Sequence, residues 1–164
     1  MPVTQQQFRD AMARLGAAVN VITSDGPAGR AGLTASAVCS VSDDPPTLLV
    51  CINRSTEQNS VIKKNGVLCV NVLTAGQQDV SNVFAGATKC TTEQRYLTGE
   101  WGVLETGAPV LAGAAVSFDC VVDEVLEKGT HSVFFAHIQA VRVGDNSPAL
   151  MWWSRKYHPL GSAA

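Results

Sequence analysis

Hydroxyl side chains recur at alternate positions in one segment of this 164-residue chain, residues 33–42. The odd positions are apolar, and every even position except Val38 carries a hydroxyl group, namely Thr34, Ser36, Ser40 and Ser42. On an extended strand such side chains share one face and recur about every 7 Å, so they could line the polar edge of a flat heteroaromatic ring or its phosphate tail. A solvent-facing strand side explains the pattern equally well.

A second polar group stands in the sequence "NRSTEQNS", where a predicted strand meets a predicted helix. Free amides at the helix start, two hydroxyls and the Arg54 guanidinium could converge there on an anion, with Asn53, Ser55 and Thr56 beside it. The simpler alternative is that Ser55 caps the helix, with Gln58 completing a capping box, and that Arg54 is solvated.

Of three histidines, His131 stands out because it follows a turn containing Gly129 and opens an alternating apolar run. An imidazole at that position could donate a hydrogen bond or a proton to a ligand. His137 lies an even number of positions later and therefore shares its face of the strand. We expect a structural role for His137, whereas for His131 local sequence leaves a ligand contact and a structural role open.

Several other chemistries are not indicated. The glycines of "GPAGRAG" have neither Rossmann nor P-loop spacing, and no HExxH or Ser-His-Asp pattern stands out. The five cysteines include no CxxC pair and lie mostly in apolar runs, so neither a disulfide framework nor a metal site is expected.

The elements that must position these groups are mostly strands. A short amphipathic helix is predicted from Thr4 to Leu15, and two further helices are predicted in the middle of the chain. Apolar or alternating runs predict strands at 17–26, 32–42, 47–53, 67–73, 114–126, 131–143 and 149–153. The helical inserts cover 55–65 and 76–86, and 85–109 reads as a long connection anchored by Trp101. Short connections favour antiparallel pairing of the strands. A barrel is favoured over a sandwich, because closing the sheet removes strand edges that would otherwise be exposed.

Composition limits the class of protein. A hydrophobic fraction of 46%, a charged fraction of 16% and a net charge of −2 predict one compact domain over residues 1–164 and make nucleic acid an improbable partner. So few charges on a small surface favour a homodimer. No run has the length of a membrane span or the form of a signal peptide, so we expect no membrane association and a cytoplasmic location.

Taken in order, the blocks "GPAGRAGLTASAVCSVSDDPPTLLVCINRS", "NGVLCVNVL", "VSNVFAG", "GTHSVFFAHI" and "RKYHPL" resemble the short-chain flavin reductases, and the resemblance runs from about residue 8 to 160. These proteins are the reductase components of two-component flavin monooxygenases. The resemblance implies a mainly β, FMN-binding split barrel with a few short helices that works as a homodimer. It also implies hydride transfer from NADH or NADPH to FMN or FAD, with reduced flavin passed to a separate oxygenase.

The resemblance implies roles for particular residues. Those near the flavin ring are Thr34, Ala35, Ser36 and Ala37, with Ser40, Val41 and Ser42 further along. Those near the ribityl chain and phosphate are Asn53, Ser55, Thr56, Asn59 and Ser60. Two further segments approach the flavin. The first contains Phe84, Ala85 and Gly86, and the second, near the C-terminus, contains Arg155, Tyr157 and His158. Gly129 and His131 match the motif that places the histidine on the nicotinamide side, which makes His131 the candidate catalytic residue.

The resemblance is weakest over residues 87–101, where "TTEQRY" replaces a more acidic pattern. A non-catalytic flavin-binding or storage protein on the same barrel would use the same cradle residues and remains an alternative. A barrel oxidase acting on pyridoxine phosphate would need a basic phosphate cluster that the sequence does not provide.

Overall fold

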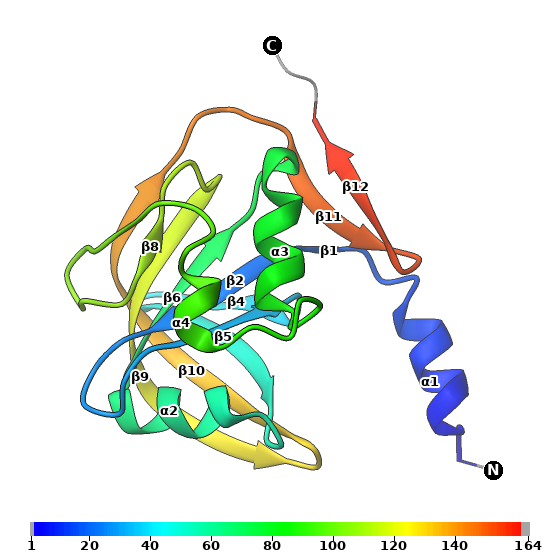
Figure 1. Cartoon of the computed structure of the whole chain (residues 1–164). Coiled ribbons are helices and arrows are strands. Elements are labelled where there is room, and N and C mark those ends of the chain that lie inside the picture. Colours follow the sequence, from blue (N-terminus) through cyan, green and yellow to red (C-terminus); the bar gives the residue numbers. More distant parts are fainter. Residues whose placement is uncertain (1, 162–164) are drawn as a thin grey trace.

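The computed structural model describes residues 2–161, and its largest element is an antiparallel sheet of seven strands (Figure 1). In sheet order the strands are β3 (Ala31–Ala35), β2 (Asn20–Ser24), β6 (Val67–Val72), β9 (Val116–Lys128), β10 (His131–Val143), β5 (Pro46–Asn53) and β4 (Val38–Asp43). The edge strands β3 and β4 are not paired with each other in residues 2–161, yet only Ser36 and Ala37 separate them along the chain. A link this short spans at most about 11 Å, so the sheet curls until its edges nearly meet. The predicted mainly β split barrel is confirmed.

One hydrophobic core fills the barrel. In the first half of β10 the even positions Ser132, Phe134 and Ala136 are buried and the odd positions are half-exposed, as the strand period requires. Phe134 packs inside against apolar side chains of β2, β5, β6 and β9. Helix α2 (Glu57–Asn65) lies across one end of the barrel and contributes the fully buried Ile62 to this core.

A second core lies outside the barrel wall, where β2 is buried on its other face as well. It includes Val21, Phe84 and Tyr96, and it is covered by helix α3 (Gln78–Phe84), which follows a 3-10 helix (Ala75–Gln77). Gly32 allows the close approach, because a Cβ there would lie 2.5 Å from the Phe84 ring. The connection after α3 contains α4 (Thr92–Arg95), β7 (Trp101–Gly102) and β8 (Val110–Leu111). Trp101 packs against Phe84 and Tyr96, so its predicted anchoring role is confirmed.

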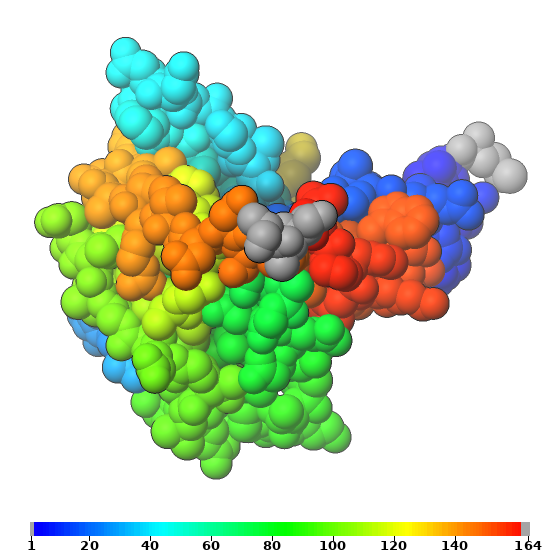
Figure 2. Space-filling model, turned by 90° about the horizontal axis from the view of Figure 1, so that it is seen from above, coloured from blue at the N-terminus to red at the C-terminus, as the bar shows by residue number. Residues whose placement is uncertain are grey.

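A small sheet extends from the barrel as an arm, made of β1 (Ala17–Ala18), β11 (Ala149–Trp153) and β12 (Lys156–Leu160). Helix α1 (Gln5–Met12) precedes it, and the arm and helix stand out from the body in Figure 2. Helix α1 buries none of its residues. Residues 2–161 include no helix with the length and apolarity needed to cross a bilayer.

The predicted single strand over residues 32–42 is wrong. The chain leaves the sheet at Ser36 and Ala37 and re-enters it on the opposite edge as β4. Leu33 and Ala35 face the barrel core before the link, and the even-numbered Val38 faces it afterwards. The hydroxyls therefore do not share one face. Val38, the one even position without a hydroxyl, marks the break, but in the sequence it is a single exception to an otherwise regular alternation.

Three smaller predictions also change. The first helix begins after its N-cap, Thr4, and its regular part ends at Met12 rather than Leu15. The predicted capping box at Ser55 is wrong, because Thr56 is the N-cap of α2 and Gln58 instead accepts a hydrogen bond from the Gly32 amide at 2.8 Å. Strand β12 was not predicted at all, because its sequence has no clear alternation.

Candidate functional site

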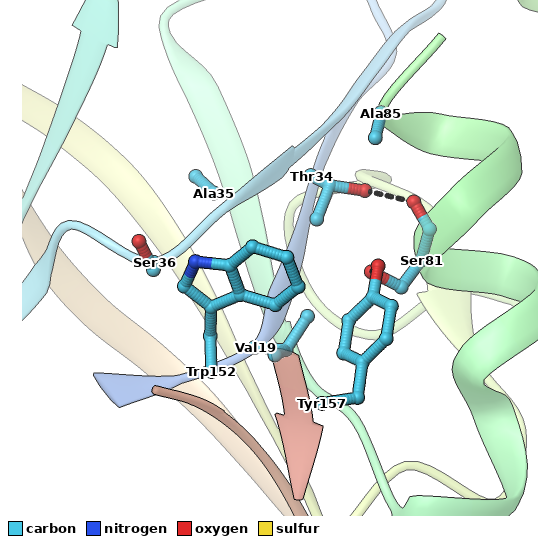
Figure 3. Close-up of a pocket in the computed structure, with 8 residues that line it drawn as sticks. All are labelled: Val19, Thr34, Ala35, Ser36, Ser81, Ala85, Trp152 and Tyr157. Atoms are coloured by element: carbon cyan, nitrogen blue, oxygen red, sulfur yellow. Dashed lines mark hydrogen bonds between the residues drawn. The ribbon is translucent and has the colours of Figure 1, made fainter. Parts of the chain in front are cut away.

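A pocket of about 220 Å³ lies where strand β3 meets helix α3 and the arm (Figure 3). Small and hydroxyl-bearing side chains form one side of it, and the rings of Trp152 and Tyr157 form the other. The residues that line it are Val19, Thr34, Ala35, Ser36, Ser81, Ala85, Trp152 and Tyr157. All eight are uncharged, so the pocket suits a flat, largely neutral group better than an ion.

Hydrogen bonds hold the walls of the pocket in place. Thr34 donates from Oγ1 to the Ser81 carbonyl at 2.7 Å, which ties β3 to α3. The hydroxyls of Ser81 and Tyr157 lie 2.8 Å apart, and the Tyr157 hydroxyl also donates to Asn82 Oδ1 at 3.0 Å. The Tyr157 ring packs edge-on to Trp152 with centroids 4.9 Å apart. The arm is therefore joined to the helix by the same side chains that line the pocket.

The link between β3 and β4 connects this pocket to a second polar region. The Ala37 carbonyl accepts from the Cys51 amide at 3.0 Å, whereas the Ser36 and Ala37 amides donate to no other group within residues 2–161. Cys51 is half-buried, and burial raises the pKa of its thiol, which keeps it neutral. Two residues further along β5, about 7 Å away, Asn53 lies on the same face of the sheet.

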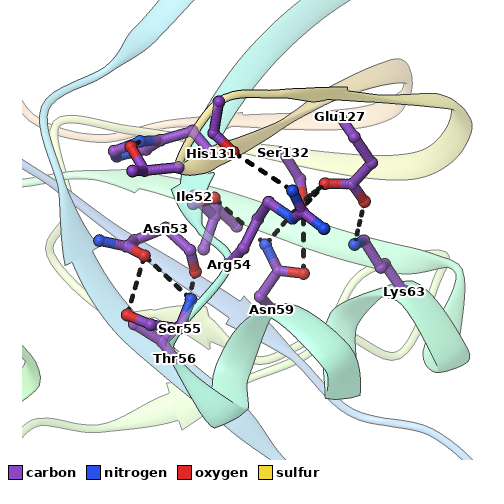
Figure 4. A network of polar contacts seen from close by, with 12 residues as sticks. Ile52, Asn53, Arg54, Ser55, Thr56, Asn59, Lys63, Glu127, His131 and Ser132 are labelled. Atoms are coloured by element: carbon purple, nitrogen blue, oxygen red, sulfur yellow. Dashed lines mark hydrogen bonds and ion pairs between the residues drawn. The ribbon is translucent and has the colours of Figure 1, made fainter.

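The second region gathers the end of β5, the start of α2 and the β9–β10 hairpin (Figure 4). Asn53 is the cross-strand partner of His131, and its Oδ1 accepts from both the amide and the hydroxyl of Ser55 at 2.9 Å. Gly129 has a φ of 56°, which fits the first central position of a two-residue type II′ turn. The half-buried His131 follows this turn, with its Nδ1 2.9 Å from the Thr130 hydroxyl.

Arg54 is not the free cation that the sequence suggested. Its Nε lies 2.9 Å from Glu127 Oε2, and its Nη1 donates to the Gly129 carbonyl at 3.2 Å. Hydrogen bonds from Lys63 and Ser132 to Glu127 hold the pKa of that carboxyl below its usual value, and the charge of Arg54 adds to the effect. The anion site predicted around Arg54 therefore has its guanidinium already committed to a carboxylate.

Several predicted cofactor residues lie apart from the pocket. Asn59 is buried and donates to the Ile52 carbonyl at 3.1 Å and to Ser132 Oγ at 3.0 Å, and Ser60 lines a different hollow beside α2. Phe84 faces the second core, although Ala85 next to it lines the pocket. Gly86 adopts a φ of 83° in the turn after α3.

Others lie on the arm or at the barrel edge. Arg155 Nη2 lies 2.6 Å from Asp10 Oδ1, so it is tied to α1. His158 faces away from Tyr157 and contacts the Trp153 carbonyl at 3.1 Å. On the edge strand β4 lie Ser40, Val41 and Ser42. A flavin contact by any of these residues stays a prediction.

The comparisons with known proteins settle the family. The model of the flavin reductase like domain matches residues 12–161. The chain belongs to the flavin reductase family. The chain is 54% identical over 158 residues to the FMN reductase (NADH) RutF of Serratia proteamaculans strain 568, covering 96% of this chain and 89% of that protein. These matches confirm the resemblance to the flavin reductases, a family of enzymes, that the sequence showed.

Solved flavin reductases have the same fold. The flavin reductase component of a bacterial two-component tryptophan halogenase, BorF, superposes with a TM-score of 0.90 at 27% identity, covering 98% of this chain and 100% of that one. The flavin reductase PheA2 gives a TM-score of 0.88 at 28% identity, with 98% and 100% covered. The split barrel is therefore the fold of the family.

Sequence reasoning missed three of the residues that line the pocket, Val19, Ser81 and Trp152. Trp152 had a detectable signal, because in "ALMWW" it lies two residues after Leu150 and therefore shares the buried face of the strand, whereas Trp153 lies on the exposed face. Val19 and Ser81 had none, since each lies in an apolar or helical run that reads as ordinary core.

Proposed function

We propose that this flavin reductase transfers a hydride from NADH to FMN and releases the reduced flavin to a separate oxygenase. The observation that carries the proposal is the 54% identity, over almost the whole chain, to a relative named FMN reductase (NADH). The description of BorF as the reductase component of a two-component system supports an oxygenase partner.

The pocket supports binding of a flavin ring. A flavin presents a flat apolar body and an edge of hydrogen-bonding atoms. Trp152 and Tyr157 offer aromatic walls, Ala35 and Ala85 leave room, and Ser36 offers both an amide and a hydroxyl. The oxidised ring carries no net charge, which agrees with an uncharged lining. The residues present therefore fit the group.

The start of α2 supports binding of the phosphate end. Thr56, the N-cap, makes no side-chain hydrogen bond to the helix, because its hydroxyl donates to the Asn53 carbonyl at 3.0 Å. The Asn59 amide donates to the Thr56 carbonyl at 3.2 Å, which leaves the amides of Glu57 and Gln58 to water or to an anion, and the helix dipole favours negative charge there. Ser55 is exposed beside them.

Bound flavin and nicotinamide would supply the redox chemistry themselves. The chain would bind the two rings, orient them and exclude water between them. Through its imidazole, His131 would contact the nicotinamide nucleotide from the hairpin. The pocket would hold the flavin through shape and main-chain contacts, so no residue of the chain needs to gain or lose a proton for hydride transfer.

An anaerobic assay tests the proposal. Purified protein is mixed with FMN, and NADH is added while the flavin absorbance is followed; catalytic bleaching is expected. Parallel reactions with FAD and with NADPH measure the preference that the relative's name suggests. Tight flavin binding without NADH oxidation would support the alternative of a storage protein instead.

We also propose a homodimer. Helix α1 has eight residues, none of them buried, and a helix of that length needs tertiary packing to persist in water. Its Phe8 and Met12 are 56% and 46% exposed, and Leu15 just after it is 64% exposed. A second copy would cover this apolar stripe. Light scattering of the wild type should give twice the chain mass, and Phe8→Asp should shift it towards the monomer. The cytoplasmic location stays a prediction from sequence.

A further inference from the structure

Glu127 joins three segments that are distant in the sequence (Figure 4). Its carboxylate contacts Lys63 on α2 and Arg54 at the end of β5, and it accepts a hydrogen bond from Ser132 Oγ at 2.9 Å. Ser132 is its cross-strand partner in the β9–β10 hairpin. The three elements are the ones that surround His131.

The contacts continue from Glu127 to both sides of His131. Arg54 donates from its guanidinium to the Gly129 carbonyl at 3.2 Å and from its amide to the Thr130 carbonyl at 2.9 Å. On the other side Ser132 is fully buried and accepts from Asn59 Nδ2. The residues on both sides of His131 are thus held to β5 and α2.

These contacts contribute more to geometry than to global stability. The side chains of Arg54, Glu127 and Lys63 are 52%, 42% and 33% exposed, and ion pairs at such exposure stabilise a fold little. The Ser132 and Asn59 contacts are buried, so their direction is fixed by packing. Arg54 hydrogen-bonds the carbonyls of both turn residues, so the carboxylate that pairs with Arg54 also acts on the position of the turn.

We propose that Glu127 is a positioning residue for hydride transfer: through Arg54, just after β5, and Lys63, in the last turn of α2, it holds the Gly129–Thr130 turn in place and so fixes where the His131 imidazole meets the nicotinamide nucleotide. This inference rests on the proposed function of the site. Glu127 does not itself contact the nucleotide, so its loss should act only through His131.

The test is a double-mutant cycle between Glu127→Gln and His131→Ala. Glu127→Gln alone should raise the KM for NADH roughly three-fold and leave kcat and the flavin Kd within about two-fold, since a displaced contact weakens binding of one substrate. In the double variant the KM should equal that of His131→Ala, because residues acting through one another are not additive. Arg54→Lys keeps the positive charge but cannot bridge Glu127 and the Gly129 carbonyl together, so it should reproduce the effect of Glu127→Gln.

Glu124→Gln is the matched control, because Glu124 is an exposed carboxylate on the same strand and forms no ion pair in residues 2–161. It should behave as wild type. Additive effects in the cycle, an unchanged KM in Glu127→Gln, or equal losses in flavin and NADH binding with a lowered Tm would overturn the inference. Wild-type protein that reduces no flavin with NADH would instead contradict the proposed function.

Discussion

The two halves of the candidate site are built in opposite ways. The pocket between β3, α3 and the arm is lined by eight uncharged residues, two of them aromatic. The hairpin region is built around a carboxylate with two cations and a buried amide. A planar ring is recognised by shape and dispersion, whereas the hairpin turn is held by directional charged contacts. The difference suggests that flavin binding and nicotinamide binding can be altered separately, and four variants or conditions can test that separation.

The largest effect is expected from filling the pocket. Ala85→Trp places an indole in a cavity of about 220 Å³, and the flavin Kd should rise at least ~100-fold because the ring loses its space. Ala85 is exposed, so the fold should persist. Ala87→Trp, an exposed position two residues on that does not line the pocket, is the control. Flavin fluorescence titration measures both, and equal Kd values would place the flavin elsewhere.

Removal of the aromatic wall should weaken flavin binding less. Trp152→Ala is expected to raise the flavin Kd about 30-fold, because a large stacking surface is lost. Its neighbour Trp153 faces the other side of β11, 49% exposed, with its indole nitrogen donating to the Arg14 carbonyl at 3.2 Å. Trp153→Ala should leave the flavin Kd within about two-fold. The same titration distinguishes the two tryptophans, and similar losses would indicate a general effect on the arm.

Substitution of the histidine should affect the other substrate. His131→Ala is expected to raise the KM for NADH roughly ten-fold while the flavin Kd stays within about two-fold, since one hydrogen-bonding contact is lost. His137, on the same face of β10, has its Nε2 3.7 Å from Asp123 Oδ2 and provides the control. Steady-state kinetics with varied NADH compares them. A wild-type KM in His131→Ala would give His131 the structural role that local sequence left open.

The smallest effect concerns pH. The pKa of Glu127 is lowered in the folded protein, chiefly by its hydrogen bond from Lys63. The contribution of a carboxyl with a lowered pKa is fully present above its unfolded value of about 4.5 and is lost as pH falls through the folded value. The protection of the Arg54 amide, which donates to the Thr130 carbonyl, against hydrogen exchange should therefore decrease below about pH 4.5, before the barrel core opens. In Glu127→Gln this pH-dependent change in hydrogen exchange should disappear. Its persistence would assign the titration to another group.

The sequence predicted the elements whose signals are local. Strands β5, β6 and β10 were found because alternation or continuous apolar runs follow the strand period, and α3 was found from its helical spacing. The turn at Gly129 was found because a glycine in a two-residue loop is a local requirement. The order of blocks along the chain identified the family, which no single motif did.

The relations that depend on tertiary contacts could not be predicted. Arg54 looked free because its partner Glu127 lies on a distant strand, and Gln58 looked like a capping residue because its partner Gly32 lies on another sheet edge. The break after Ala35 was hidden because the alternation resumes after a single exception, Val38. Trp152 reached the pocket only because the arm folds back beside α3.

The two-residue link that splits the barrel determines which changes this protein can tolerate. Within residues 2–161 no strand lies beside Ser36 and Ala37, so their amides stay free, and almost any residue supplies a main-chain donor equally well. Substitutions at either position therefore leave those donors in place. Insertion of one residue would rotate them away and shift β4 by half a strand period, exchanging its inner and outer faces. The length of the link is therefore constrained more strictly than its residue types. Proteins that share this site should differ in the residue types of the link before they differ in its number of residues.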